Sequence, residues 1–546
     1  MGRIAWFSLG LVLSTWIAIG YAYGEVVLNT QVGEEVRYLD PQKSTGISSS
    51  HIAINLFSGL YEYGHKNGDP EPDLAKSVTP NKDFTEYTVE LNPGNYWVQN
   101  KGGKIVKQRE ITAEDVVYSY RRMLSPQLAS EYSYMLFVIK NGKEFLEGKI
   151  KDPQMLGVKA LSKYKVKITL EGSVPTFIKY LPHHTFHLVP REPIEKHGDQ
   201  WIKAENIWTS AAFAFSEWKL KDRITVVKNP HFRDAKDVQV DKIHFRFIGT
   251  YSPEAVRAFR SGETDIDFQT PPSNDLKRLK RDGVLALSPQ LGTYFFRINT
   301  TKPPLDNPKI RRALALTIPR ESLARYVFKG GQSPAYSMIP KAHSGYTPAP
   351  FLKNQGPNYN RIKEAQILLA EAGYPRGKGF PTFSLVYNTA ELHKKVAVVV
   401  AKEWKKALGI TVKPMNQEWR VYLNNGKSMN YDIMRAGWVA DMDDPMNFAN
   451  LFISNGGNNN TGFANKIYDD LINKAMVEGD FDKRNKIIRE AETLLMAELP
   501  VLPVISYVSI NLKHKYVSGF YANKFDQHPL RYVKIDEALR KKQFKK

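Results

Sequence analysis

The absence of cysteine is the strongest constraint on how this chain can fold. Its 546 residues contain none, so no disulfide can staple a small or loop-rich scaffold. The folded state must therefore rest on the burial of apolar side chains, and this length exceeds what a single hydrophobic core supports. With 42% hydrophobic and 24% charged residues, the composition is that of an ordinary globular protein. We expect two or three domains.

The first 24 residues have the layout of a secretory signal peptide. A basic Arg3 precedes an apolar run from Ile4 to Ile19, which is followed by small residues. We predict cleavage after Ala22 or Gly24. The run is near the lower limit for crossing a bilayer, so an uncleaved N-terminal anchor is the alternative. With no cysteine after the leader to accept a lipid, we expect an exported, periplasmic protein that is not a lipoprotein.

The net charge of +21 makes the surface strongly basic. Lysine and arginine are spread along the chain and gather only in a terminal tail at 540–546. Nucleic-acid binding would favour a basic stripe, and an exported protein meets little nucleic acid, so we expect no nucleic-acid partner. The charge indicates a solvated basic face, or proximity to anionic lipid or cell-wall polymer.

Helix and strand patterns alternate along the sequence. Residues 252–262 open with a serine N-cap and a proline and close on glycine, which predicts a helix. A short strand is expected directly after it, over 264–268. Similar punctuation, or apolar spacing of three and four residues, predicts further helices at 307–316, 319–330, 360–373 and 391–409, the last followed by a strand. This alternation indicates mixed α/β domains whose sheets are covered by helices.

Motifs for catalysis are missing from the sequence. It has no GxSxG nucleophile elbow, no thiol and no HExxH zinc motif. His183, His184 and His187 form the one histidine cluster, and a metal there would need a further ligand from elsewhere; a histidine-rich crossover between domains is the favoured interpretation. We expect no enzyme activity, no metal and no cofactor.

Ten segments, in order, together resemble the bacterial extracellular solute-binding proteins of family 5, and specifically their oligopeptide-binding members. The resemblance runs from about Leu28 to about Arg531. Its segments are RYLDPQ, LFSGLY, DLAKS, TAEDVVYSYRR, RSGETDI, NTTKPPLDNPKIRRAL, LLAEAGY, YNTAELHKK, NQEW and YDIMRAGWVADMDDP.

The resemblance implies a three-lobed α/β fold of the type II periplasmic-binding class, in its large peptide-binding form, with hinge closure over the ligand. The crossovers between the lobes would allow this closure without unfolding. After the leader, lobe I is projected to consist of three separate segments, at 25–57, at 188–291 and, with the basic tail, at 509–546. Lobe II is projected at 58–187 and lobe III at 292–508. The implied partners are a short peptide and the membrane subunits of an ABC importer, with the protein itself a monomer.

The same resemblance implies how the ends of a peptide are held. Asp441 matches the carboxylate that receives the ligand's α-ammonium, and Arg435 matches the group that takes the carboxylate of a three-residue ligand. For longer ligands the matching group is His393, with Lys329 a looser candidate. Main-chain pairing is implied at Gly46 and Ile47 and at 435–438, which includes Gly437. Side-chain pockets would be lined by Trp419 and Trp438.

Two positions depart from the pattern of the oligopeptide binders. Thr45 and Arg297 each stand where that pattern has a glutamate near the ligand. Both changes would make the binding cleft more positive, so we expect acidic peptides, including carboxylate-rich murein peptides, to be favoured. The alternative is that Arg297 pairs with a nearby acid and leaves the cleft neutral.

Three functions remain open at the level of sequence. The first is a peptide-binding component of an ABC importer. The second is the same fold binding another solute, such as a murein peptide, a nickel complex or a sugar. The third, a secreted hydrolase of peptides or cell-wall fragments, lacks the required nucleophile or metal motif.

Overall fold

A computed structural model describes residues 24–33, 35–249, 252–352 and 360–544. The predicted signal peptide and its cleavage site at Ala22 lie outside the described residues; Gly24 is the first of them. None of the described helices is both long and apolar enough to cross a membrane.

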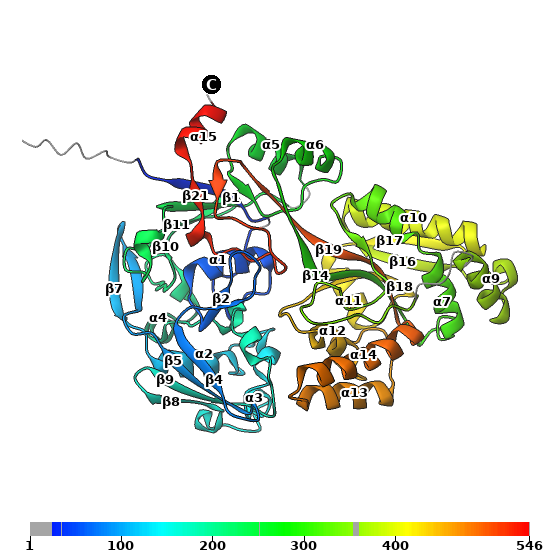
Figure 1. Cartoon of the computed structure of the whole chain (residues 1–546), viewed down its shortest axis with the longest axis horizontal. Coiled ribbons are helices and arrows are strands. Elements are labelled where there is room, and N and C mark those ends of the chain that lie inside the picture. Colours follow the sequence, from blue (N-terminus) through cyan, green and yellow to red (C-terminus); the bar gives the residue numbers. More distant parts are fainter. Residues whose placement is uncertain (1–23, 34, 250–251, 353–359, 545–546) are drawn as a thin grey trace, which may run out of the picture.

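One mixed sheet of eleven strands runs through the whole molecule (Figure 1). Ten strands form its main path and β15 (Ser333–Pro334) pairs beside β19. In spatial order the ten are β10 (Phe213–Lys219), β11 (Arg223–Lys228), β12 (Lys242–Arg246), β1 (Val27–Gln31), β13 (Ile266–Asp267), β19 (Val501–Lys513), β14 (Leu285–Ile298), β18 (Ile433–Val439), β16 (Phe383–Asn388) and β17 (Val412–Gln417).

Two large hydrophobic cores divide the chain into two bodies. We call residues 24–290 with 509–544 the N-terminal body and residues 292–508 the central body. The first core draws on residues from Leu28 to Phe268 and returns at Tyr516 to Ile535. The second lies almost wholly within the central body. The first core is continuous across the predicted lobes I and II, so the boundary between those two lobes stays a prediction.

The N-terminal body adds smaller sheets and short helices to its portion of the large sheet. Its further strands are β2 (Tyr61–Tyr63), β3 (Pro70–Pro72), β4 (Ala75–Pro80), β5 (Glu86–Leu91), β6 (Tyr96–Lys101), β7 (Lys104–Glu110), β8 (Val158–Ser162), β9 (Lys165–Thr169), β20 (Val517–Ser518) and β21 (Lys534–Ile535). Its helices are α1 (Ile47–Leu56), α2 (Ala113–Met123), α3 (Gly142–Leu146), α4 (Arg191–His197), α5 (Pro253–Ser261), α6 (Leu276–Asp282) and α15 (Glu537–Gln543).

Helices of the central body pack around β14, β16, β17, β18 and β19 (Figure 1). They are α7 (Pro308–Thr317), α8 (Arg320–Ser322), a π-helical turn (Leu323–Phe328), α9 (Arg361–Glu371), α10 (Glu391–Leu408), α11 (Trp419–Lys427), α12 (Met446–Ala449), α13 (Lys466–Val477) and α14 (Phe481–Glu498).

Three helices begin at the N-cap residues that the sequence predicted. The Ser252 hydroxyl accepts from the main-chain N–H of Glu254, and Gly262 ends α5 in the left-handed region at φ 80°. Asn307 caps α7 and Asn360 caps α9 in the same way. The segment predicted as one helix over 319–330 contains the π-helical turn, and the strand after α10 starts at Val412.

Two strands, β14 and β19, belong to both bodies. Their ladder pairs Leu285–Pro289 with 508–512 and resumes at Thr293 with Ser506, so it is interrupted at residues 290–292. Gly292 sits in this gap, where a Cβ would lie 2.6 Å from the Tyr507 ring. The bodies are therefore joined by continuous strands with a break in their pairing.

Candidate functional site

Asp441 follows β18 at the junction between the bodies and is partly buried. The Tyr134 hydroxyl donates to its Oδ2 at 3.1 Å, and the Asn447 side chain lies 3.4 Å from the same oxygen. Burial raises the pKa of Asp441 to about 6, against the opposing effect of these two donors. No ion pair in the described part of the chain includes Asp441, so this carboxylate lacks the cation that normally accompanies a desolvated acid.

Three tyrosines of the N-terminal body surround this carboxylate. Burial, and then the charge of Asp441, raise the pKa values of Tyr63, Tyr132 and Tyr134. The rings of Tyr132 and Tyr134 are 5.9 Å apart. Because aromatic faces attract cations, an acid among tyrosines is a suitable place for a small ammonium group.

A cavity of about 890 Å³ opens beside β18 between the two bodies. Arg435, Gly437 and Val439 line it, in keeping with the two-residue alternation of a strand. The Arg435 guanidinium donates to Asn388 Oδ1 at 3.2 Å and to the Tyr507 hydroxyl at 3.0 Å. The cavity thus contains the permanent positive charge of a guanidinium, held in place by neighbouring side chains.

His393, near the start of α10, also lines this cavity. Its side chain is buried, and its ring lies 5.6 Å from that of Tyr294. Burial, reinforced by the charge of Arg435, lowers the pKa of His393 to about 2. The imidazole is therefore neutral, and its buried Nδ1 has no hydrogen-bond partner among the described residues.

Two lysines stand at the edge of the same cavity. Lys395 lines it directly and pairs with Glu391 at 3.6 Å. Lys329 holds the left-handed position that ends the π-helical turn, and its Nζ lies 3.4 Å from Oδ1 of Asn274, a lining residue. Lys329 is thus adjacent to the cavity rather than within its lining.

One edge of β18 is left open because β16 pairs with it at only two positions. β16 pairs with β18 only at Ile433 and Met434. Beyond Met434, no described strand pairs with β18 on that side, where the Arg435 carbonyl accepts from the Tyr422 hydroxyl, whereas β14 remains paired on the other side as far as Val439. The predicted main-chain pairing segment at 435–438 therefore lies on an open strand edge between Arg435 and Asp441.

A second cavity of about 520 Å³ lies on the other side of Asp441. Trp438 lines it, and its indole N–H donates to Asn447 Oδ1 at 2.8 Å. Tyr134 and Asn447, the two donors to Asp441, line it as well.

Several residues of the predicted site lie apart from these cavities. Trp419 is 51% exposed at the start of α11 and stacks on Tyr422. Arg297 lies beyond the lining of both cavities; its guanidinium is 5.9 Å from the Phe295 ring centre and close to Gly426 of α11. Because Arg297 is an odd number of positions from the cavity-lining Tyr294 on β14, it points to the opposite face of the sheet. The expected positive contribution of Arg297 to the cleft is therefore not supported.

Thr45, Gly46 and Ile47 are exposed at the start of α1. Gly46 has the extended conformation expected for pairing, at φ −95° and ψ 144°, but Ile47 is already the first residue of the helix. Only Gly46 therefore offers the strand-like backbone that was predicted for both.

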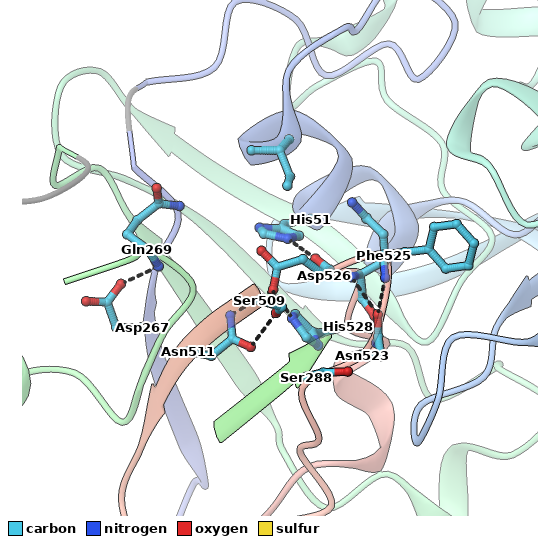
Figure 2. Close-up of polar contacts among 12 residues, drawn as sticks. His51, Asp267, Gln269, Ser288, Ser509, Asn511, Asn523, Phe525, Asp526 and His528 are labelled. Carbon is cyan, nitrogen blue, oxygen red and sulfur yellow. Dashed lines mark hydrogen bonds and ion pairs between the residues drawn. The ribbon is translucent and has the colours of Figure 1, made fainter. Parts of the chain in front are cut away.

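A buried His51, Asp526 and His528 group is the one set of described residues whose spacing could suit a metal ion (Figure 2). Asp526 Oδ1 already accepts from Ser509 at 2.6 Å, Asn511 at 2.8 Å and His528 at 3.1 Å. The His51 Nε2 lies 2.5 Å from the Asp526 carbonyl oxygen. Because these atoms are already used in hydrogen bonds, we interpret the group as a network that ties α1, β19 and the 523–528 loop together.

The three neighbouring histidines of the sequence are also buried. Burial lowers the pKa of His183 well below its usual value and those of His184 and His187 to about 4. His184 Nε2 lies 3.1 Å from the Ser44 carbonyl oxygen. All three are buried within the N-terminal body, and the crossover between domains stays a prediction.

Sequence reasoning missed the tyrosines and the asparagines of the site. Tyr134 is 307 positions from Asp441, and nothing local to Tyr63 or Tyr132 distinguishes them from core aromatics. Lys395 belongs to the same helix as His393, and its spacing of two residues gave no reason to place both beside one cavity.

Two α/β bodies that share strands and have solute-sized cavities between them are the arrangement of the hinged, solute-binding class of proteins. Residues 69–460 match the model of the bacterial extracellular solute-binding proteins, family 5 Middle. The chain belongs to this family.

Individual relatives are similar to this chain over nearly its whole length. The periplasmic oligopeptide-binding protein OppA of Salmonella typhimurium is 34% identical over 495 residues, covering 89% of this chain and 88% of that protein. The murein tripeptide-binding protein MppA of Escherichia coli has a solved structure with a TM-score of 0.81 at 30% identity, covering 94% of this chain and 99% of that one. The OppA of Haemophilus influenzae, solved with the peptide RPPGFSPFR, gives a TM-score of 0.78 at 30% identity, covering 94% and 99%.

Proposed function

We propose that this protein captures short peptides outside the cytoplasm and delivers them to an ABC importer, without acting on them as an enzyme. The observation that carries the proposal is the open edge of β18, with Arg435 at one end and the carboxylate of Asp441 beyond the other. These groups complement the main chain, the carboxylate and the ammonium that all linear peptides share.

The spacing supports the same proposal. Arg435 and Asp441 are six positions apart, which corresponds to at most roughly 20 Å of extended chain. Extended peptides of three to six residues span roughly 10 to 20 Å. A cationic side chain at one end and an acid at the other would also fix the direction in which the ligand lies.

Incubation of the purified protein with a defined peptide pool, followed by mass spectrometry of bound and free fractions, tests the function. We expect intact peptides of three to six residues in the bound fraction and no new fragments in the free fraction. Shortened peptides would instead identify a hydrolase. Retention of no peptide, with retention of a sugar or a nickel complex offered in parallel, would assign another solute.

Arg435→Ala is expected to weaken binding of tripeptides more than binding of pentapeptides. The resemblance assigns Arg435 to the carboxylate of three-residue ligands, and a charge-assisted hydrogen bond is lost only where that carboxylate reaches the guanidinium. Calorimetric titration of Ala₃ and Ala₅ measures both. Arg297→Ala, which removes an arginine from the opposite face of the sheet, is the matched control and should leave both affinities unchanged. Equal losses for the two lengths in Arg435→Ala would contradict the assignment.

Peptide affinity should depend on pH through Asp441. In the ligand-free protein the pKa of Asp441 is raised to about 6, and an ammonium ligand binds the ionised form. The affinity should be flat near pH 7.5 and fall below pH 6, approaching tenfold per pH unit, because binding must then release a proton. Titrations from pH 7.5 to 4.5 measure this. His393, with a pKa of about 2, stays neutral throughout. Asp441→Asn should bind weakly with no such slope, and a flat wild-type profile would refute the role.

We also propose export by the leader at 1–24, with a mature chain beginning near Tyr23 or Glu25 and released into the periplasm without a lipid anchor. The family match to extracellular proteins supports this, as does the order of basic, apolar and small residues at the N-terminus. Osmotic shock should release the protein, and N-terminal sequencing should begin at one of these two residues. Recovery solely with membranes, with Arg3 retained, would favour an uncleaved anchor.

A further inference from the structure

The 520 Å³ cavity beside Asp441 is unusually rich in methionine. Of the 12 methionines in the sequence, Met135, Met442, Met446 and Met476 line this one cavity. Methionine is unbranched and polarisable, so walls made of it adapt to apolar groups of different shape. Met135 comes from the N-terminal body and the other three come from the central body, so the cavity is completed only when the bodies lie together.

Charged groups in this lining are not available to a ligand. Arg484 donates to both carboxylate oxygens of Asp444 at 2.9 Å, and both side chains are buried. Glu171 is exposed at the rim and accepts from the main-chain N–H of Asn141. No other charged side chain among the described residues lines the cavity, so its interior favours an uncharged, apolar occupant.

The cavity shares walls with the surroundings of Asp441. Tyr134 and Asn447 both donate to the Asp441 carboxylate, and Trp438 donates to Asn447. All three line the cavity. Asp441 itself does not line the cavity, but both of its donors do. For a ligand whose ammonium meets Asp441, the first side chain is therefore the one nearest to this opening.

On α13 the rim is apolar and exposed. Met476 is 41% exposed and Val477 is 63% exposed on α13. An apolar side chain that enters here would bury its own surface and would also cover these exposed apolar side chains. Both contributions favour binding. A cavity of this volume is also much larger than a methyl group, so alanine would leave it largely unfilled.

We propose that this cavity selects peptides whose first residue carries a large, flexible apolar side chain, such as methionine, leucine or phenylalanine. The inference rests on the proposed function, because binding of the peptide's α-ammonium at Asp441 decides which ligand residue lies beside the cavity. The cavity lies beside the first residue only, so the second position should be far less selective.

Calorimetric titration of two peptide series tests the proposal. In X-Ala-Ala, with X as Met, Leu, Phe, Ala, Lys or Glu, the three large apolar residues should bind about 10- to 100-fold more tightly than alanine, as expected for burying two to four carbon groups. In Ala-X-Ala the same substitutions should change affinity less than about fivefold. Selectivity confined to the second position, or equal affinities across the first series, would overturn the proposal.

A substitution at the rim tests whether the preference for an apolar first residue arises from this cavity. Met476→Glu should reduce the affinity for Met-Ala-Ala at least tenfold while preserving or improving that for Lys-Ala-Ala, because it replaces an apolar rim residue by a second acid beside Glu171. Met476 is partly exposed, so the variant should fold. Met415→Glu is the matched control, since Met415 is 46% exposed on β17 outside the cavity. An unchanged ratio in Met476→Glu would overturn the assignment. If no tripeptide binds wild type, the proposed function itself fails; if all bind alike, only this inference fails.

Discussion

Asp441→Ala should weaken binding of an unmodified peptide by about 2 to 5 kcal/mol, the range found when one side of a buried charged pair at an interface is removed. The ligand's ammonium would otherwise be desolvated beside Tyr134 and Asn447 with no counter-charge. Calorimetry on Ala₃ with wild type and variant measures the loss.

N-acetylation of the peptide is the matching control on the ligand, because it removes the charge of the α-ammonium group. Wild type should lose most of its affinity for N-acetyl-Ala₃, whereas Asp441→Ala should bind the two forms almost alike. Asp237→Ala removes an exposed carboxylate outside both cavities and should behave as wild type. Equal losses on acetylation in wild type and in Asp441→Ala would show that Asp441 does not hold the ammonium.

Asp526→Ala should lower the free energy of unfolding by about 3 to 5 kcal/mol, as expected when a buried charged acceptor is removed from several donors. Ser509, Asn511 and His528 would each lose a hydrogen bond to Asp526 (Figure 2). Urea unfolding followed by circular dichroism gives the loss as a shift of midpoint at unchanged slope.

Two variants make the stability prediction specific. Asp526→Asn keeps one acceptor oxygen and should lose less than Asp526→Ala. Asp69→Ala removes the exposed acid that pairs with Lys524, two residues before Asp526, and should cost less than about 1 kcal/mol. A loss in Asp526→Ala no greater than in Asp69→Ala would mean that the network contributes little to the folded state.

Local signals in the sequence predicted elements well because their causes are local. Ser252, Asn307 and Asn360 each cap the helix that was expected after them, since their side chains satisfy main-chain N–H groups within three residues. The apolar spacing of α10 predicted its buried face for the same reason. The resemblance added Asp441, Arg435 and His393, which lie beside the two cavities described above.

What could not be predicted depends on contacts between distant segments or on side-chain direction. Tyr134 reaches Asp441 from another body of the molecule, and no periodicity encodes that meeting. The resemblance places Arg297 near the ligand, but its position in the alternation of β14 turns it to the other face of the sheet. Trp419 occupies the exposed start of α11, which the resemblance alone could not reveal.

The shared strands β14 and β19 have a mechanical consequence. Because no loose linker joins the two bodies at this point, opening must change the twist of both strands. Residues 290–292 are where that twist can change without breaking a β14–β19 ladder bond, while Gly292 stays paired with Val439 of β18. The two continuous strands are therefore the place where a hinge between the bodies would bend, and their pairing limits how far it can do so. The Tyr507 ring lies against Gly292 in this stretch, so a side chain larger than hydrogen at 292 would displace the ring or one of the two strands that connect the bodies.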